Sequence, residues 1–359
     1  MADYKQKLAG LIETTIAQGA SDLHLGAGHQ PLLRVSGVMT QLLSEPALTQ
    51  EDMVALLGEM AGAERSAAFM QKQELDFSYD YAGSGAAGGA RFRGNAYFER
   101  GRIGIALRLI PRAIRTLAEL RLPPVLEQFA TREQGFFLVV GPVGQGKTTT
   151  LAALIEKVNQ ERTEHIVTIE DPIEYLFENK RSLVDQREVR VDTANFAVAL
   201  QSVFRQDVDV LMIGEMRTPE TISTAVTAAE TGHLVLSTLH TNNAVQTIDR
   251  IIDVFPGSQQ DQIRIQLAGS LAGIFSQRLV PRISGGLIPA YELLINSVAV
   301  QNLIREKRTH EIQTLIETGA EEGMIDMNRS LAELVRAGEI SIESAYSRSL
   351  SPKNLERLL

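Results

Sequence analysis

The sequence contains no cysteine and no tryptophan, and aromatic residues make up only 5% of its 359 residues. The lack of cysteine excludes disulfide bonds, thiol catalysis and cysteine-ligated zinc. The scarcity of aromatic rings argues against the stacking platforms that hold single-stranded nucleic acid. A formal charge of −9 likewise argues against a protein that coats DNA or RNA.

Long apolar runs are also missing. No stretch of 18 or more consecutive apolar residues occurs, so we expect no transmembrane helix. The first ten residues include the acidic Asp3 and lack the continuous apolar core of a signal peptide. Leu8, Leu11 and Ile12 instead follow helical spacing. We therefore expect a cytoplasmic protein that meets a membrane only through a partner.

One motif stands out among the residues that are present. The segment Gly141-Pro-Val-Gly-Gln-Gly-Lys-Thr148 fits the phosphate-loop pattern G-x-x-x-x-G-K-[ST] at every specified position. It lies between an apolar run, 136–140, and a helix-compatible run, 149–155. Glycines let backbone N–H groups turn toward phosphate oxygens, and the helix N-terminus adds its positive end. Lys147 would reach the β- and γ-phosphates of ATP, and the Thr148 hydroxyl would ligate Mg²⁺. The residues expected to contact the nucleotide are Gly141, Pro142, Val143, Gly144, Gln145, Gly146, Lys147, Thr148 and Thr149.

The hydrophobic pattern divides the chain into four parts. Residues 1–110 alternate short helical and strand patterns, including a helix-forming stretch over 50–72, and predict an α+β domain with an antiparallel sheet. Residues 111–124, between two prolines, predict a linker. Residues 125–297 predict a doubly wound α/β core, and 298–359 a small helical bundle. The strands expected in the core are 136–140, 165–169, 208–213 and 234–239.

Chemically useful side chains follow several of these strands, at the edge where ligands bind in open α/β sheets. Glu170 and Asp171 follow the second strand and Glu215 the third. His240 follows the fourth strand, and His233 precedes it. Each residue alone also fits a cap, a solvated acid or a structural histidine. Carboxylates here would hold Mg²⁺ through water and activate the attacking water, and a histidine would neutralise the γ-phosphate.

The third strand departs from the usual pattern. P-loop ATPases carry an aspartate at its end, whereas this chain has Gly214 followed by Glu215. Glu215 would therefore act on Mg²⁺ at one remove, through water, and Glu170 would supply the general base. The sequence does not separate the roles of the two carboxylates.

Taken together, these residues resemble the secretion ATPases that power type IV pili and type II secretion. The resemblance runs over nearly the whole chain and implies a PAS-like N-terminal domain, a RecA-like ATPase core and a homohexameric ring. It implies that Arg91, Arg93 and Arg108 reach an ATP site between subunits as arginine fingers, and that Asp171 and His233 belong to that site. The matching segments are 21–25, 90–93, 141–148, 168–174, 213–217 and 231–241.

Two features resemble the retraction branch of that family. The segment Val300-Gln-Asn-Leu-Ile-Arg-Glu306 is close to its tail signature, and the four-cysteine zinc site of extension ATPases is absent. The resemblance implies a motor for pilus retraction and twitching motility that turns an inner-membrane platform protein (PilC-like) from its cytoplasmic face. Thr218 departs from the family's aspartate, which puts in doubt a cap on the helix that follows. The alternatives are a nucleic-acid translocase on the same core and an accessory regulatory ring.

Overall fold

The computed structural model describes residues 3–35, 37–83, 89–110 and 113–359. It divides into an N-terminal unit, residues 1–113 with 172–176, and a C-terminal unit, residues 114–171 with 177–359. Pro111 and Arg112, at the start of the expected linker, lie outside the described residues. The domain boundaries drawn from the sequence stay predictions.

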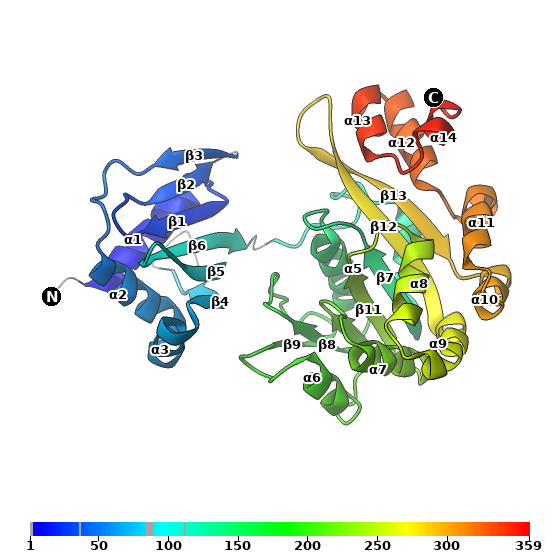
Figure 1. Cartoon of the computed structure of the whole chain (residues 1–359), viewed down its shortest axis with the longest axis horizontal. Helices are drawn as coiled ribbons and strands as arrows, with labels where there is room; N and C mark the ends of the chain where they lie inside the picture. The colour runs from blue at the N-terminus through cyan, green and yellow to red at the C-terminus, as the bar shows by residue number, and fades with distance from the viewer. Residues whose placement is uncertain (1–2, 36, 84–88, 111–112) are drawn as a thin grey trace. The chain divides into compact units, whose positions relative to one another are not determined.

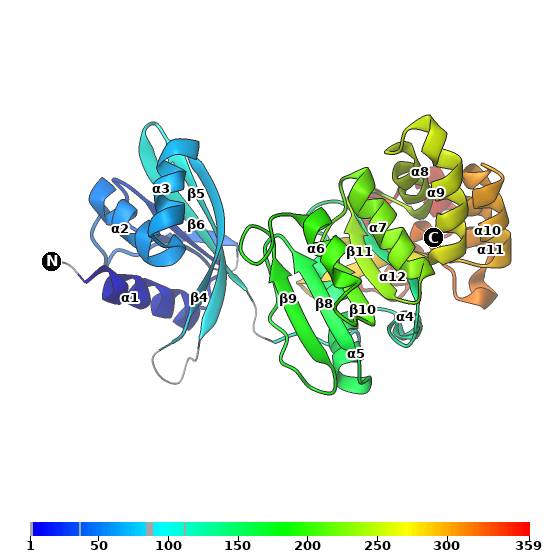
Figure 2. The same ribbon diagram turned by 90° about the horizontal axis from the view of Figure 1, so that it is seen from below.

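The N-terminal unit is an antiparallel sheet with helices on one face (Figures 1 and 2). Its six strands lie in the order β3-β2-β1-β6-β5-β4, and all neighbours pair antiparallel. The expected α+β domain is thus confirmed. The elements are α1 Tyr4–Ala17, β1 Asp22–Gly26, β2 Leu32–Val35, β3 Val38–Gln41, α2 Gln50–Ala61, α3 Ala63–Lys72, β4 Glu74–Tyr81, β5 Ala90–Glu99 and β6 Arg102–Ile110.

Strand alternation sorts this sheet into an apolar face and a polar face. Leu23 and Leu25 of β1 are buried in a core with the apolar sides of the three helices. His24, between them, therefore lies on the opposite face. The helix-forming stretch expected over 50–72 is helical and consists of two helices. Gly62 separates them with φ 79° and ψ 163°, a conformation outside the helical region.

The C-terminal unit is built on a seven-stranded sheet in the order β13-β12-β7-β11-β10-β8-β9 (Figure 1). All neighbours pair parallel except β12 and β13, which form an antiparallel hairpin. The elements up to this hairpin are η1 Pro124–Leu126, α4 Glu127–Ala130, β7 Gly135–Val140, α5 Lys147–Glu161, β8 His165–Glu170, β9 Leu183–Glu188, α6 Phe196–Val203, β10 Val210–Ile213, α7 Pro219–Glu230, β11 Leu234–Leu239, α8 Ala244–Asp253, α9 Gly257–Ser270, β12 Leu271–Pro281 and β13 Leu287–Ile295.

Helices cover both faces of this sheet, as its sequence requires. All six residues of β7 are buried. Phe136 and Leu138 pack into the core shared with α6, α7 and α9, whereas Phe137 and Val139 pack into the core shared with α5. Figure 2 shows α7 and α5 on opposite sides of the strands. Continuous apolar runs are typical of parallel strands covered on both faces, and the four strands expected in the core are confirmed.

The segment after Val298 does not form one bundle. Helices α10 (Val298–Arg305) and α11 (Ile312–Thr318) pack with α9 in the main core. Helices α12 (Met327–Arg336), α13 (Ile342–Arg348) and α14 (Pro352–Glu356) form a separate cluster on the β12–β13 hairpin. We call these last three the C-terminal helix group. The prediction of a single bundle is wrong because each set of apolar faces is buried against a different part of the sheet.

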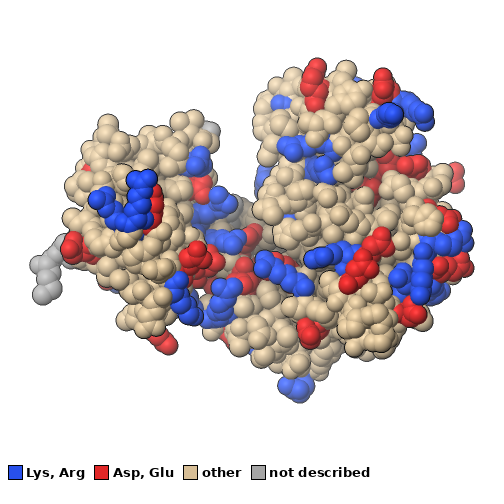
Figure 3. All heavy atoms as spheres, viewed as in Figure 1, with Lys and Arg blue, Asp and Glu red and all other residues tan. Residues whose placement is uncertain are grey.

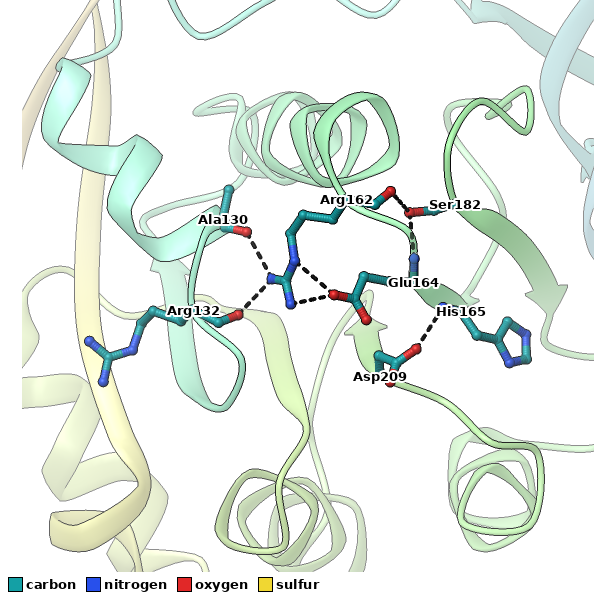
Figure 4. Close-up of polar contacts among 7 residues, drawn as sticks. All are labelled: Ala130, Arg132, Arg162, Glu164, His165, Ser182 and Asp209. Atoms are coloured by element: carbon teal, nitrogen blue, oxygen red, sulfur yellow. Dashed lines mark hydrogen bonds and ion pairs between the residues drawn. The ribbon is translucent and has the colours of Figure 1, made fainter.

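A network of hydrogen bonds connects neighbouring elements at the amino-terminal edge of the sheet (Figure 4). The Arg162 guanidinium, at the end of α5, donates to the carbonyl oxygens of Ala130 and Arg132 at 3.0 and 2.6 Å. It also donates to the Glu164 carboxylate at 2.8 Å. Ser182 Oγ then donates to Arg162 O at 2.7 Å. These bonds tie α4, α5, β8 and the start of β9 together at the edge opposite the phosphate loop.

Candidate nucleotide-binding site

The phosphate loop joins the end of β7 to the start of α5, and its glycines have conformations that other residues rarely adopt. Gly141, Gly144 and Gly146 have φ values of 147°, 76° and 78°. A Cβ atom at position 141 would lie only 2.4 Å from the carbonyl oxygen of Gln277. The N-cap of α5 is Gly146, which makes no side-chain cap hydrogen bond. A helix N-terminus that follows such a glycine loop is a typical site for an anion.

Lys147 folds back over this loop. Its Nζ donates to the carbonyl oxygens of Gly141 and Pro142, both at 2.9 Å, and the side chain is almost fully buried. The ammonium therefore lies inside the curve of the loop, where phosphate oxygens bind in P-loop proteins. Thr148 and Thr149 are partly exposed in the first turn of α5, next to this curve.

The structure brings His240 to Lys147, as the strand ends predict. His240 Nδ1 lies 3.2 Å from Lys147 Nζ. The pKa of His240 is lowered, because burial disfavours the charged ring and the Lys147 ammonium repels a second positive charge. The neutral imidazole then accepts at Nδ1 and keeps a proton at Nε2 that can be donated elsewhere.

Glu170 and Glu215 stand at neighbouring strand ends but differ in their surroundings. Glu170 is 3% exposed and accepts hydrogen bonds from Thr168 Oγ1 at 2.6 Å and Gln186 Nε2 at 3.2 Å. Glu215 is more open and pairs with the exposed Arg217 at 2.9 Å. Glu215 is therefore the carboxylate with freer access to water, and Glu170 is held in place by its neighbours.

Among the described residues, no cluster of three or more His, Asp or Glu side chains is arranged to hold a metal ion. Mg²⁺ in a nucleotide site takes most of its ligands from phosphates and water. Thr148 on the loop and Glu215 on the adjacent strand end supply the hydroxyl and the carboxylate that such a site needs.

One expected site residue is not brought to the loop within the chain. His233 lies at the opposite end of β11 from His240, and the six residues of this strand separate the two by about 20 Å. Its ring contacts the Ala228 carbonyl oxygen and stacks edge-on against Phe204. Asp171 directly follows Glu170, but its carboxylate pairs with Arg190 at 2.6 Å.

The three arginines expected to act as fingers share one face of the N-terminal sheet, whereas the phosphate loop belongs to the C-terminal unit. Arg93 and Arg108 are direct cross-strand neighbours on β5 and β6, and Arg91 lies two residues from Arg93. Arg108 Nε donates to Asp22 at 2.9 Å, and Arg91 donates to Asp80 at 2.5 Å. Arg108 is the most exposed of the three, at 71%, and Arg91 the least, at 10%.

One residue that braces the loop, Gln277, was missed by sequence reasoning. Gln277 on β12 accepts from Thr150 Oγ1 and donates to Gln145 O, both at 2.7 Å. The Gln145 side chain in turn accepts from Leu279 N at 2.7 Å. The polar run Ser276-Gln-Arg278 between apolar residues of β12 was the available signal for Gln277, but β12 itself was not predicted. The doubted cap is present, since Thr218 Oγ1 accepts from Thr221 N at 3.4 Å at the start of α7.

A cavity of about 360 Å³ lies beside the start of α5. Gly146, Thr149 and Thr150 form the wall nearest the loop. Arg115, Leu120, Arg121, Leu122, Gln277, Leu279, Arg282 and Leu287 are among the residues that form the remaining walls. Apolar side chains and planar guanidinium groups together suit the flat faces of a nucleobase.

A parallel sheet that delivers a phosphate loop, two carboxylates and a histidine at its carboxyl edge defines a P-loop ATPase with a RecA-like core. The sequence profile described as "Type II/IV secretion system protein" matches residues 116–309. The chain belongs to this family of secretion ATPases.

Individual relatives resemble the chain over nearly its full length. A "Type IV pilus retractation ATPase PilT" from Pseudomonas aeruginosa is 42% identical over 96% of this chain and 98% of its own. A "Twitching motility protein" from Neisseria gonorrhoeae is 40% identical over 97% of this chain and 92% of its own. The "Crystal Structure of the Pilus Retraction Motor PilT and Bound ADP" superposes with a TM-score of 0.89 at 44% identity, covering 97% of this chain and 98% of that one.

Proposed function

We propose that this chain is the subunit of a hexameric, ATP-hydrolysing motor that powers type IV pilus retraction. Two observations together carry the proposal. The chain gathers Lys147, Glu170, Glu215 and His240 at the carboxyl edge of its sheet, and it is similar over almost its whole length to relatives named for pilus retraction and twitching motility.

The contacts around the loop support a proposed role for each side chain. The N–H groups of the loop and of the first α5 turn hold the phosphates of ATP, and Lys147 turns from the loop carbonyls to the β- and γ-phosphates. Thr148 and, through water, Glu215 would hold Mg²⁺, which would spread the charge of the phosphates. Glu170 or Glu215 orients and deprotonates the attacking water. His240 donates from Nε2 to the γ-phosphate.

The cavity beside α5 takes the nucleoside half of ATP. Its wall begins at Gly146 and Thr149, so phosphates on the loop would lead directly into it. The base would lie between apolar side chains such as Leu122 and Leu279 and the guanidinium groups on the same walls.

The site is completed by a neighbouring subunit. Arg93 and Arg108 form an exposed pair on the polar face of the N-terminal sheet, and Arg108 carries the larger exposed fraction. Such guanidinium groups placed over the γ-phosphate would stabilise the charge that develops during hydrolysis. Arg91 supports this pair from the next position on the same face. Binding and release of nucleotide would move one unit of the chain against the other about residues 111–124.

We further propose that the ring works at the cytoplasmic face of the inner membrane on a PilC-like platform protein. None of the helices among the described residues is long and apolar enough to cross a bilayer. Positive and negative side chains are interleaved on the face of the C-terminal unit drawn in Figure 3, which suits a protein partner better than a nucleic acid.

A deletion strain scored for surface pili tests the direction of the motor. Loss of a retraction motor should leave excess pili that do not retract and abolish twitching, and Lys147→Ala should fail to restore either. Bald cells would refute retraction. ATPase activity stimulated by single-stranded DNA, in a salt-dependent manner, would favour a translocase instead. Intact nucleotide binding with turnover near zero would favour a regulatory ring.

A further inference from the structure

Glu339 joins two arginines at the wall of the nucleotide cavity. Its carboxylate accepts from Arg121 Nη1 at 3.0 Å and from Arg282 Nε at 2.7 Å. Both arginines line the cavity, and Glu339 lies behind them in the connection between α12 and α13. The carboxylate therefore touches the cavity only through these two guanidinium groups.

The backbone fixes Glu339 in this place. Gly338 ends α12 with φ 69°, which lets Glu339 N donate to Leu334 O at 3.0 Å. Glu339 O accepts from Ile283 N at 2.9 Å, on the β12–β13 connection. The next residue, Ile340, is buried in the core of the C-terminal helix group. Glu339 is thus attached to that helix group and to the β12–β13 hairpin.

The orientation of Arg121 and Arg282 depends on the negative charge of Glu339. Arg121 and Arg282 would repel each other if they lined the same cavity without a shared anion. The hydrogen bond from Arg282, together with the charges of both arginines, holds the pKa of Glu339 below its ordinary value. The carboxylate is therefore ionised at neutral pH and keeps the two planar groups in one orientation.

We propose that Glu339 is a positioning residue for the nucleoside half of ATP, and that it couples the C-terminal helix group to the nucleotide cavity. The inference rests on the proposed function, because it assumes that ATP occupies the phosphate loop and the adjoining cavity. Glu339 sets the orientation of the Arg121 and Arg282 guanidinium groups, and a base stacked on either group binds more tightly in that orientation. Binding of the phosphates to the loop does not depend on Glu339.

Full-length protein and three variants test this separation. Glu339→Gln removes the charge, Glu339→Asp keeps it, and Glu356→Gln removes an exposed charge elsewhere in the same helix group. For Glu339→Gln we expect KM for ATP to rise about 3–10-fold with kcat within about twofold of wild type. Glu339→Asp should recover part of the loss, and Glu356→Gln should match wild type.

Inorganic tripolyphosphate carries phosphates without a base. It therefore distinguishes weaker binding of the nucleoside from weaker binding of the whole nucleotide. In Glu339→Gln, the inhibition constant of ADP should rise with KM while that of Mg²⁺-tripolyphosphate stays unchanged. An equal rise in the inhibition constants of ADP and tripolyphosphate, or an unchanged KM for ATP, would overturn the inference. Lys147→Ala serves as the opposite control and should weaken both inhibitors. If wild-type protein bound neither ATP nor tripolyphosphate, the proposed function itself would fail, and the inference with it.

A double-mutant cycle adds an independent check. If Glu339 acts through the two arginines, Glu339→Gln should have little further effect on KM in a chain that already carries Arg121→Gln and Arg282→Gln. Additive effects would mean that Glu339 acts by another route, which would contradict the assignment.

Discussion

Lys147 and Glu215 contact different parts of the site, so their substitution should have separable effects. Lys147→Ala removes the ammonium held inside the loop, and we expect nucleotide affinity to fall at least about 10-fold. Glu215→Gln keeps the shape of the side chain, so affinity should stay near wild type while turnover falls at least about 100-fold. Calorimetric titration and phosphate release measure the two effects. If Glu215→Gln hydrolysed ATP normally, Glu170 would be the carboxylate that activates water.

Two histidines at opposite edges of the C-terminal sheet should have pKa values that are shifted in opposite directions from the ordinary value of 6.5. The pKa of His240 is lowered below 6.5 by burial and by Lys147. Burial also opposes charge on His165, but Asp185 and the carbonyl oxygens of Asp207 and Gln206 raise its pKa above 6.5. Neutral His240 therefore contributes stability that falls as the pH drops from 6.5 through its folded pKa. The contribution of His165 is present below 6.5 and is lost as the pH rises through its folded pKa.

Ring-proton NMR measures these values directly, with His240→Gln and His165→Gln assigning the signals. The His240 midpoint should lie below 6.5 and the His165 midpoint above it. The reverse order would contradict the surroundings described for both rings. Hydrolysis should also weaken on the acid side as His240 gains a proton beside Lys147, and this weakening should be smaller in His240→Gln, measured relative to that variant's own rate at neutral pH.

At the scale of elements, the turn from β7 to α5 depends on Gly141. A Cβ there meets the backbone of β12 and the residue has φ 147°, so Gly141→Ala should cost about 1–3 kcal/mol of unfolding free energy. It should also weaken ADP binding, because the loop cannot keep its curve. Gly10→Ala is a matched control, since Gly10 lies on the exposed side of α1 with no atom within 4 Å of its added Cβ. That change should stabilise the protein by about 0.5–1 kcal/mol. Urea unfolding and ADP titration would show whether the two glycines differ in this way.

Elements with a strong hydrophobic pattern were predictable from the sequence. Elements defined by the pairing of strands were not. The four buried parallel strands are mostly apolar, which identified them from sequence. Strand β9, at the edge of the sheet, has the polar sequence LVDQRE and carries no such signal. Its side chain Gln186 nevertheless bonds to Glu170. The position of Gln277 against the loop likewise follows from the pairing of β12 beside β7.

At the scale of the whole molecule, a site shared between subunits predicts complementation. A chain with Lys147→Ala keeps its arginines, and a chain with Arg93→Ala and Arg108→Ala keeps its loop. Each variant alone should hydrolyse ATP at least about 100-fold more slowly than wild type. After equal mixing and exchange of subunits, about one quarter of the interfaces would pair a working loop with working arginines, so activity should return to about that fraction. No recovery, with exchange confirmed by native mass spectrometry, would place the arginines outside the neighbouring site.

The sequence by itself determined the phosphate loop, the parallel core and the antiparallel N-terminal sheet. These features follow from local chemistry, because glycine spacing and hydrophobic period act over a few residues. Only the tertiary structure decided which candidates share a site. It placed His240 against Lys147, kept His233 a strand length away, and set Glu339 behind two cavity arginines. Those relations depend on strand order and helix packing, which bring together residues far apart in the chain.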